Sequence, residues 1–376
     1  MRQIQMVDLV TQYEKIKSEI NEATQNVFQT AQFVNGPEVK AFQAELESYL
    51  GVKHVIPCAN GTDALQIALM ALGLEPGDEV ITSDFTFAAT VEVIGLLKLT
   101  PIIVDVDPAT FNISLEEIKK AITPKTKAII PVHLFGQSCD MEPLLQLAKD
   151  NNIFIVEDTA QAIGAEYTFP NGTVKKAGTI GEIGTTSFFP SKNLGCFGDG
   201  GAIFTNDDEL AVIIRSIVNH GMGKRYYYDR LGVNSRLDSV QAAILRIKLK
   251  HLDSYNKSRQ NAAAFYTNFF RDFEQVETPA EVDYSTHVFH QYTLKIKNVD
   301  QYALQSFMNE KGVPAMIYYP MPLHTQKAYG AENFDHSNFP VTNELCKTVI
   351  SLPIHTELDQ EQLNYICNAM KEYLNK

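Results

Sequence analysis

The stretch Ile153-Phe154-Ile155-Val156-Glu157-Asp158-Thr159-Ala160-Gln161 decides the fold of this chain. Its four consecutive apolar residues predict a short strand that is buried on both faces, as in parallel sheets covered by helices. Ligands of such sheets bind beyond the carboxyl ends of the strands. Asp158 ends this strand, so we expect it to lie at a binding site.

Similar apolar runs alternate with amphipathic stretches between about residue 50 and residue 250. The runs predicted to be strands are residues 80–82, 102–104, 128–132, 153–156, 186–188 and 202–204. Helical spacing occurs between them, for example at residues 115–122 and 141–150. This alternation predicts an α/β fold with a mostly parallel sheet and helices on both faces.

The pattern changes after residue 250. Residues 236–270 predict a long helix or a helix pair, and residues 168–173 predict a hairpin tip with Asn171-Gly172 as its turn. The elements expected further on are a strand at 291–296, a helix at 302–311, a strand at 313–319 and a helix at 360–375. We therefore divide the chain into a large α/β domain (residues 1–250, including the N-terminal segment) and a small C-terminal α+β domain (residues 251–376).

Composition limits the possible partners. The chain has 376 residues, of which 45% are hydrophobic and 20% charged, as in ordinary soluble proteins. Its net charge of -13 opposes nucleic-acid binding, although a local site can still attract an anionic substrate. The five cysteines are scattered without metal-site spacing, and neither a signal peptide nor a membrane-length apolar stretch is present. We expect a soluble, cytoplasmic protein without a metal ion and without nucleic acid or membrane as a partner.

A lysine lies among apolar and small residues in Ser187-Phe188-Phe189-Pro190-Ser191-Lys192-Asn193-Leu194-Gly195. Loss of hydration makes the neutral amine of such a lysine available for Schiff-base chemistry. Asp158, at the end of a strand, can hold a ring nitrogen protonated. Together the two residues supply what a pyridoxal phosphate (PLP) enzyme needs from its protein. The alternative is a structural lysine and a helix-capping aspartate.

A second motif, Asn60-Gly61-Thr62-Asp63, opens a helix that ends near Gly73. The first turn of a helix offers free N–H groups and a positive dipole end to a phosphate. Gly61 permits close approach and Thr62 adds a hydroxyl, with Ser187 as a second donor. The alternative is an ordinary helix cap, which the motif taken alone favours because Asn, Thr and Asp are all good capping residues.

Several other side chains are candidates near the strand ends. Phe87 can stack on a heteroaromatic ring, whereas Phe85 fits a core position better. Gln161 lies three residues after Asp158 and can donate to a ring hydroxyl. His133 is interpreted as a core histidine. The run Tyr226-Tyr227-Tyr228 is either solvated surface or the edge of an interface or substrate site.

These motifs, in this order, resemble those of the DegT/StrS-type family of nucleotide-sugar aminotransferases, which have PLP fold type I (aspartate-aminotransferase-like). The resemblance extends over essentially the whole chain. It is carried by residues 60–65, 86–90, 157–161, 187–195, 198–202 and 232–238.

The resemblance implies a role for each matching position. It implies that Lys192 forms the Schiff base with PLP and that Asp158 pairs with the pyridine nitrogen. Gln161 would contact the ring hydroxyl, and Phe87 would stack on the ring. The phosphate contacts that it implies are Thr62, the backbone at Gly61 and Asp63, Ser187, and Asn234 of a partner subunit.

Since Asn234 acts across the interface, the implied active unit is a homodimer. Arg236 and Tyr319 match positions that contact the sugar nucleotide, and Tyr318 lies beside them.

Within the family the residues of these motifs are most similar to those of enzymes that aminate UDP-2-acetamido-2-deoxy-3-oxo-glucuronate, with L-glutamate as donor. Their products are amino sugars of surface polysaccharides such as lipopolysaccharide O-antigen. One departure is Tyr318-Tyr319-Pro320, where that subgroup has His-Tyr-Pro. It leaves a dTDP-linked 3-oxo or a 4-oxo deoxysugar as a competing substrate. A sugar dehydratase of this fold would have histidine at Lys192, and a regulatory or non-catalytic protein of the same fold is the alternative from another class.

Overall fold

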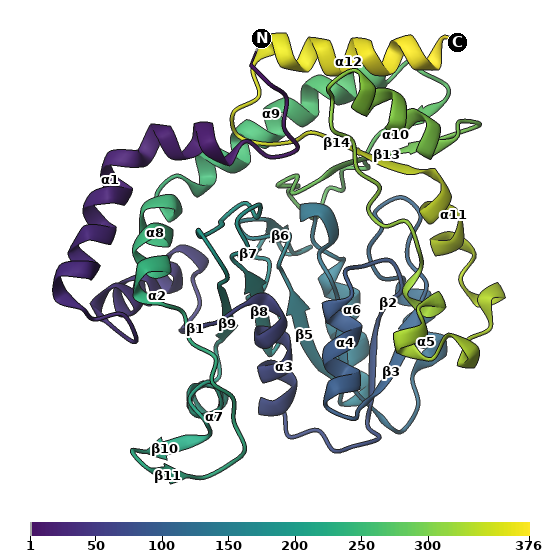
Figure 1. The fold of residues 1–376 in the computed structure, drawn as a ribbon. Coiled ribbons are helices and arrows are strands. Elements are labelled where there is room, and N and C mark those ends of the chain that lie inside the picture. The colour runs from purple at the N-terminus through teal and green to yellow at the C-terminus, as the bar shows by residue number, and fades with distance from the viewer. Residues whose placement is uncertain (1) are drawn as a thin grey trace.

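The structure is a computed structural model that describes residues 2–376 and, for Asn333, the backbone alone. Its centre is a seven-stranded sheet in the order β1-β9-β8-β5-β4-β2-β3 (Figure 1). All neighbours from β8 to β3 are parallel, whereas β9 runs antiparallel to both β8 and β1. The strands are β1 (His54–Cys58), β2 (Glu79–Ser83), β3 (Thr100–Val104), β4 (Thr126–Ile130), β5 (Phe154–Asp158), β8 (Ile183–Ser187) and β9 (Gly201–Thr205).

The six strands predicted in this region all occur, and three of them, β3, β4 and β8, begin two or three residues earlier than expected. β4 ends at Ile130, before Pro131, which has no N–H group for the sheet. β8 consists of small and hydroxyl residues that are buried without being strongly apolar, so only its end was predicted. β1 was not predicted.

Helices cover both faces of the sheet, as predicted, because alternate strand residues point to opposite sides. Val80, Ala128, Ile130 and Val156 pack with one group of helices, α3 (Gly61–Ala71), α4 (Ala89–Leu96) and α7 (Asp208–Ile217). Their neighbours Ile81, Ile129 and Ile155 pack with α5 (Leu115–Ala121) and α6 (Met141–Asn151) on the other face. Three further helices lie at the β1 end of the sheet: α1 (Leu9–Thr30), α2 (Pro37–Leu50) and α8 (Ser239–Leu249).

A second core belongs to the C-terminal part of the chain. It joins α9 (Leu252–Phe270), α10 (Gln301–Glu310) and α12 (Gln360–Leu374) to a three-stranded antiparallel sheet, and Ile4 packs into the same cluster. The sheet has the order β12 (Val276–Glu277), β13 (Tyr292–Ile296), β14 (Val349–Leu352). Residues 236–270 form a helix pair, α8 and α9, and the proposed domain division at residue 250 falls between them.

The predicted strand at residues 313–319 is wrong. Val313, Ala315 and Ile317 are buried in alternation, which produced the strand signal, but only Met316 forms a bridge, to Ser351. Pro314 cannot donate a hydrogen bond to a neighbouring strand. The strands of this sheet that were not predicted are β12 and β14.

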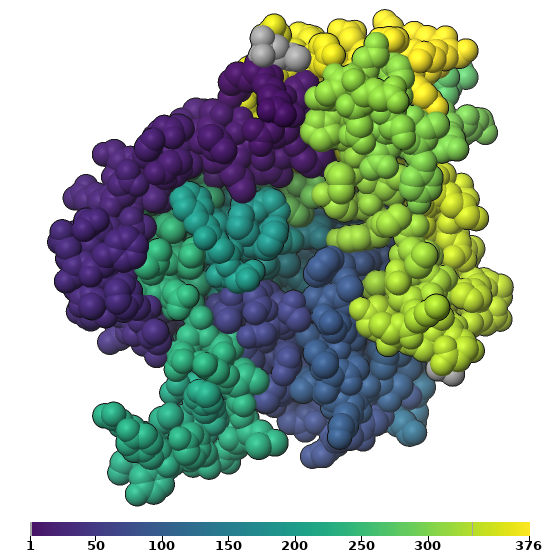
Figure 2. Space-filling model, viewed as in Figure 1, coloured from purple at the N-terminus to yellow at the C-terminus, as the bar shows by residue number. Residues whose placement is uncertain are grey.

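The remaining elements are two hairpins and a short helix. β6 (Glu166–Thr168) and β7 (Val174–Lys176) form the predicted hairpin. β10 (Met222–Lys224) and β11 (Tyr227–Tyr228) form a second hairpin that projects from the body of the molecule, at the lower left of Figure 2. Residues 320–339 contain short 3-10 turns and lead to α11 (Pro340–Thr348). Among residues 2–376, no helix has the length and apolarity that a membrane span requires.

Candidate active site

The carboxyl ends of the parallel strands meet at one edge of the sheet, and Asp158 is the last residue of β5. Its two carboxylate oxygens accept hydrogen bonds from the Ala160 amide and the Thr90 hydroxyl, each at 3.0 Å. Burial raises the pKa of Asp158, while these bonds and the positive charge of Lys192 act in the opposite direction. The carboxylate is therefore held in a fixed orientation inside the protein.

Lys192 lies five residues beyond the end of β8 in a turn closed by its own amide, which donates to the Phe189 carbonyl at 2.8 Å. Burial lowers the pKa of the Lys192 amine to about 8, and attraction to Asp158 only partly offsets this. Lys192 and Asp158 therefore lie close enough for their charges to interact, as predicted. At pH near 8 a large fraction of the amine is neutral and able to act as a nucleophile.

The predicted phosphate site lies where α3 begins beside the end of β8. A Cβ atom added to Gly61 would lie 2.7 Å from the Cβ of Ser187, so only glycine permits this approach. The side chain of Asn60 caps α3 by accepting from the Asp63 amide at 2.7 Å. The Asp63 amide is therefore engaged, and the amides of Gly61 and Thr62 are those left without a partner inside the helix.

Two further residues, Phe87 and Gln161, were predicted to contact the ring. Phe87 lies just before α4 and is 59% exposed, which leaves its ring face open. Gln161 is buried and its amide is fixed on both sides: its oxygen accepts from the Phe135 amide at 2.8 Å, and its nitrogen donates to the Tyr319 hydroxyl at 3.1 Å. The bond to Tyr319 joins the segment of residues 313–319 to the strand-end site.

Tyr318 and Tyr319 are both half-buried. Tyr319 packs edge-on against Phe85, with ring centroids 5.8 Å apart, and Phe85 itself is a core residue, as expected. Burial raises the pKa of Tyr319 and of Tyr318, so both phenols are neutral donors at physiological pH.

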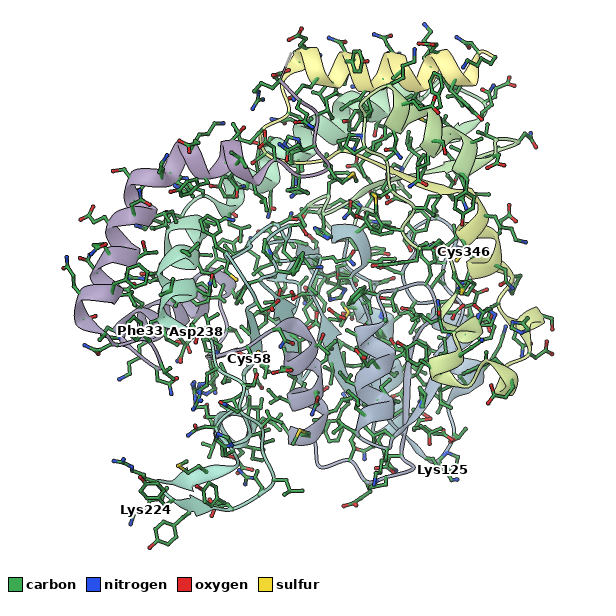
Figure 3. All side chains as sticks on the ribbon, in the orientation of Figure 1. Phe33, Cys58, Lys125, Lys224, Asp238 and Cys346 are labelled. Carbon is green, nitrogen blue, oxygen red and sulfur yellow. The ribbon has the colours of Figure 1, made fainter. Side chains whose placement is uncertain are left out.

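Among residues 2–376, no hydrogen bond joins Asn234 or Arg236 to Lys192 or Asp158 of their own chain. Asn234 is exposed and forms a bridge with Asn219, whose side-chain oxygen accepts from Arg236 at 3.3 Å. Both residues follow the projecting β10–β11 hairpin in sequence. Figure 3 places Lys224 at the far end of that hairpin.

Sequence reasoning missed one functional neighbour and interpreted another residue correctly. Thr90 was quoted only as part of a motif, although its place one helical turn after Phe87 directs it to the same strand end. His133 is a buried core histidine, as expected: its Nδ1 accepts from the Cys139 amide at 3.0 Å, and Nε2 lies 2.9 Å from Glu157. Because Nδ1 accepts, Nε2 carries the proton and donates it to the carboxylate.

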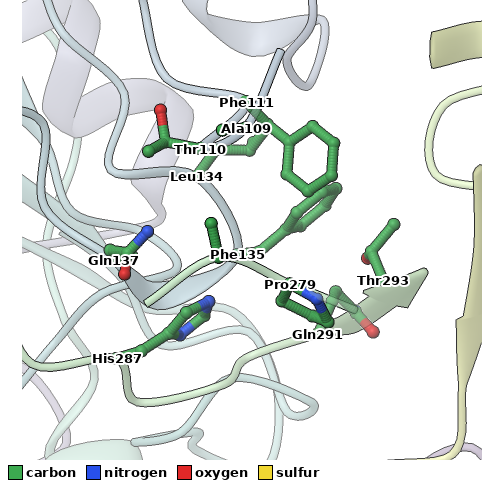
Figure 4. A pocket seen from close by; sticks show the side chains of 11 residues that line it. Ala109, Thr110, Phe111, Leu134, Phe135, Gln137, Pro279, His287, Gln291 and Thr293 are labelled. Atoms are coloured by element: carbon green, nitrogen blue, oxygen red, sulfur yellow. The ribbon is translucent and has the colours of Figure 1, made fainter. Parts of the chain in front are cut away.

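A separate small cavity lies behind Phe135 (Figure 4). It is lined by residues 109–111, 134, 135, 137, 279, 280, 287, 291 and 293, none of which is an Asp, Glu, Lys or Arg. Neither Lys192 nor Asp158 faces it, so it is not part of the reaction site.

Comparison with known proteins decides the family. The sequence profile of the DegT/DnrJ/EryC1/StrS aminotransferase family matches residues 14–371. The chain belongs to this family. Its predicted aminotransferase class and its PLP fold type I are thereby confirmed.

Three relatives match over nearly the full length of both chains. A pleiotropic regulatory protein of Geobacillus stearothermophilus is 46% identical over 98% of each chain. A UDP-2-acetamido-2-deoxy-3-oxo-D-glucuronate aminotransferase of Pseudomonas aeruginosa is 43% identical over 98% of each. A dTDP-3-amino-3,4,6-trideoxy-alpha-D-glucose transaminase of Streptomyces venezuelae is 36% identical over 99% of this chain and 97% of that one.

Two solved structures show the same fold. DesV of S. venezuelae, in complex with a ketimine intermediate, has a TM-score of 0.95 at 36% identity and covers 100% of each chain. NtdA of Bacillus subtilis, with bound cofactor PMP, has a TM-score of 0.88 at 31% identity, over 96% of this chain and 82% of that one. The predicted PLP cofactor is therefore confirmed at the level of the family.

Proposed function

We propose that this aminotransferase uses PLP to move the amino group of L-glutamate onto a 3-oxo sugar carried by a nucleotide, for the synthesis of amino sugars of surface polysaccharides. The observation that carries the proposal is the pairing of a buried carboxylate, Asp158, with an amine, Lys192, whose pKa burial lowers to about 8. A purely structural lysine would gain nothing from this arrangement.

The residues at the strand ends fit PLP. Gly61, Thr62 and Ser187 surround a place where free amides and hydroxyls suit a phosphate. Asp158 would accept a hydrogen bond from the protonated ring nitrogen, and the exposed Phe87 would stack on the ring. When bound, PLP supplies an electron sink for proton transfer beside an amino nitrogen.

The protein then has to move a proton and exclude water. Lys192 would take the proton from the carbon that bears the amino group of the donor and return it to the carbon on the opposite side of that nitrogen. This step requires a lysine amine that is neutral once it is no longer bound to the cofactor. Asp158 would keep the ring nitrogen protonated throughout. Gln161 would fix the ring hydroxyl while its nitrogen remains bonded to Tyr319.

The substrate that we propose first is UDP-2-acetamido-2-deoxy-3-oxo-glucuronate, because of the 43% identical relative that acts on it. Tyr318 limits this proposal, since its neutral phenol cannot pair with a sugar carboxylate as a cation would. A dTDP-linked 3-oxo deoxysugar, or a 4-oxo one, is the second candidate.

We also propose a homodimer that shares its active sites. On the projecting hairpin the exposed fractions of Tyr226, Tyr227 and Tyr228 are 71%, 65% and 60%, and that of nearby Leu231 is 89%. So much exposed apolar surface on a protruding element indicates a contact with another chain. Asn234 and Arg236, which follow the hairpin, would then serve the partner's phosphate and sugar-nucleotide sites.

A cytoplasmic location is part of the same proposal. The five cysteines are all free and buried, as in a reducing compartment.

A regulatory role is the second candidate, since the 46% identical relative is a pleiotropic regulatory protein. The net charge of -13 opposes a DNA-binding role. Gel-shift titration at low salt tests it, with no retained DNA expected, and an absorbance change of the bound cofactor on addition of glutamate would show that catalysis is intact.

The substrate is tested by incubating the protein, PLP and L-glutamate with a panel of 3-oxo and 4-oxo sugar nucleotides. We expect NMR to locate the new C–N bond at C3 of a UDP-linked 2-acetamido sugar. A product aminated at C4, or turnover of dTDP sugars alone, would replace the first substrate by the second.

A further inference from the structure

A buried aspartate–histidine pair joins two segments that flank the proposed site without belonging to it. Asp84 directly follows β2, and its two carboxylate oxygens accept from the His324 amide and from His324 Nδ1, each at 2.7 Å. The relative exposure of the Asp84 side chain and that of His324 are both 0%. We call this pair the 84–324 clamp.

Each half of the clamp leads to a residue that we place at the site. Asp84 is fixed to the sheet, since its amide donates to the Val104 carbonyl at 2.9 Å, and it lies three residues before Phe87. His324 lies five residues after Tyr319, beyond Pro320 and the exposed Met321. The clamp therefore joins the segment with the ring contact to the segment with the sugar contact.

The packing around His324 leaves it one orientation. Its ring stacks on Phe339, with centroids 4.1 Å apart and planes at 10°. Its Nε2 atom is buried and has no hydrogen-bond partner among the described residues. Turning the ring over would remove the bond from Nδ1 to Asp84 and leave that ring nitrogen and one buried carboxylate oxygen unpaired, at a large cost in free energy.

The far end of the same segment has an independent anchor. Asp105, which follows β3, accepts from the Val341 amide at 2.8 Å and from the amide and hydroxyl of Thr342 at 2.9 and 2.7 Å. This anchor holds the start of α11 and does not touch the run from Asp84 to Phe87. It offers a matched control of similar burial and similar bonding.

We propose that Asp84 and His324 are positioning residues that fix where Tyr318-Tyr319 lie relative to Phe87, and thereby set the affinity for the nucleotide sugar and not for the amino donor. The proposal rests on the proposed function. A small amino acid needs only the Lys192–Asp158 centre, whereas a sugar nucleotide also has to contact the segment of Tyr318 and Tyr319. Loosening His324 should thus affect the second half of the reaction much more than the first.

The test compares three variants of the full-length enzyme. His324→Leu removes the donor to Asp84, His324→Asn keeps an N–H at a similar place, and Thr342→Val removes a bond from the control anchor. For His324→Leu we expect faster amide exchange in residues 320–326 and a KM for the sugar nucleotide raised about tenfold, the effect of losing one charge-assisted hydrogen bond. The rate at which glutamate changes the cofactor absorbance should stay within about twofold of wild type.

His324→Asn should restore the wild-type KM for the sugar nucleotide. Thr342→Val should lower the thermal stability without changing this KM. Equal losses in the glutamate and sugar half-reactions of His324→Leu, or the same KM change in Thr342→Val, would overturn the proposal. Unchanged exchange at residues 320–326 would overturn it too. That readout is independent of catalysis, so it separates a failed clamp from a failed assignment of the substrate.

Discussion

Two influences act on the pKa of the Lys192 amine: burial lowers it, and the Asp158 carboxylate raises it. Burial is the larger, so the pKa falls from 10.5 to about 8. In the cofactor-free protein, we expect covalent labelling of Lys192 by an amine-specific reagent to rise with pH through a midpoint of about 8. Peptide mass spectrometry measures this. A midpoint near that of exposed lysines would show that burial does not activate the amine.

The same pKa predicts a stability effect. Between about pH 8 and 10.5 the folded state binds fewer protons at Lys192 than the unfolded state does, so the stability of the cofactor-free protein rises with pH there. Lys192→Met should remove this contribution and stabilise the cofactor-free protein below pH 8. Denaturant titrations at pH 7 and pH 10 should show a gain at the lower pH only.

Thr90 tests how the Asp158 carboxylate is held. Thr90→Val keeps the side-chain volume but removes the 3.0 Å hydrogen bond to Asp158, and burial then raises the Asp158 pKa further. We expect the glutamate half-reaction to slow about tenfold, the worth of one hydrogen bond to a charged group. Stopped-flow absorbance measures it, and a rate equal to wild type would mean that Asp158 needs no support from α4.

At this scale the sequence predicts residues whose chemistry is local. Lys192 and Asp158 are recognisable because a lysine among apolar residues and an aspartate at a strand end are unusual. Asp84 and His324 are 240 positions apart, and nothing in either neighbourhood shows that they meet. The contact between Gln161 and Tyr319 was not predictable for the same reason.

At the scale of elements, β5 supports the site through its two adjacent acidic residues. Asp158 points to the site, whereas Glu157 points to the other face and accepts from His133 and from the amides of Gly178, Ile180 and Gly181. These bonds lower the pKa of Glu157 despite its burial, so its stabilising contribution is present above its ordinary pKa of 4.5 and is lost as the pH falls below that value.

Glu157→Gln should therefore destabilise the protein by about 2–4 kcal/mol at pH 7, because a neutral amide cannot replace a carboxylate with four donors. The difference from wild type should shrink as the pH falls toward the lower limit of folding. Urea unfolding across pH 4 to 7 checks the trend. A loss that is independent of pH would show that packing, not charge, matters at this position.

Periodicity predicted most elements of the central sheet, since alternate residues on its strands face two helical layers. It failed where the burial pattern of a segment does not match its hydrogen bonding or its polarity. Residues 313–317 alternate like a strand, but Pro314 has no N–H to offer, and β8 is buried although its residues are small and polar.

At the scale of the whole molecule, the projecting hairpin and Asn234 predict that each active site needs two subunits. Lys192→Ala should bind PLP without turning over, and Asn234→Asp should be inactive because a negative charge near the phosphate prevents PLP from binding. Refolding the two inactive variants together should restore about a quarter of wild-type activity, since half of the dimers are mixed and each has one intact site. No recovery on mixing would place Asn234 in its own subunit's site, and a monomer in light scattering would remove the dimer altogether.

The central claim is that Lys192 is the residue that binds PLP covalently, and one measurement tests it directly. The holoenzyme is reduced with borohydride, digested with trypsin and analysed by mass spectrometry. We predict a pyridoxyl group on Lys192 in the peptide of residues 177–215, left uncut at the modified lysine, and no such group in Lys192→Ala. A pyridoxyl group on another peptide, or a wild-type protein that carries none, would contradict the account.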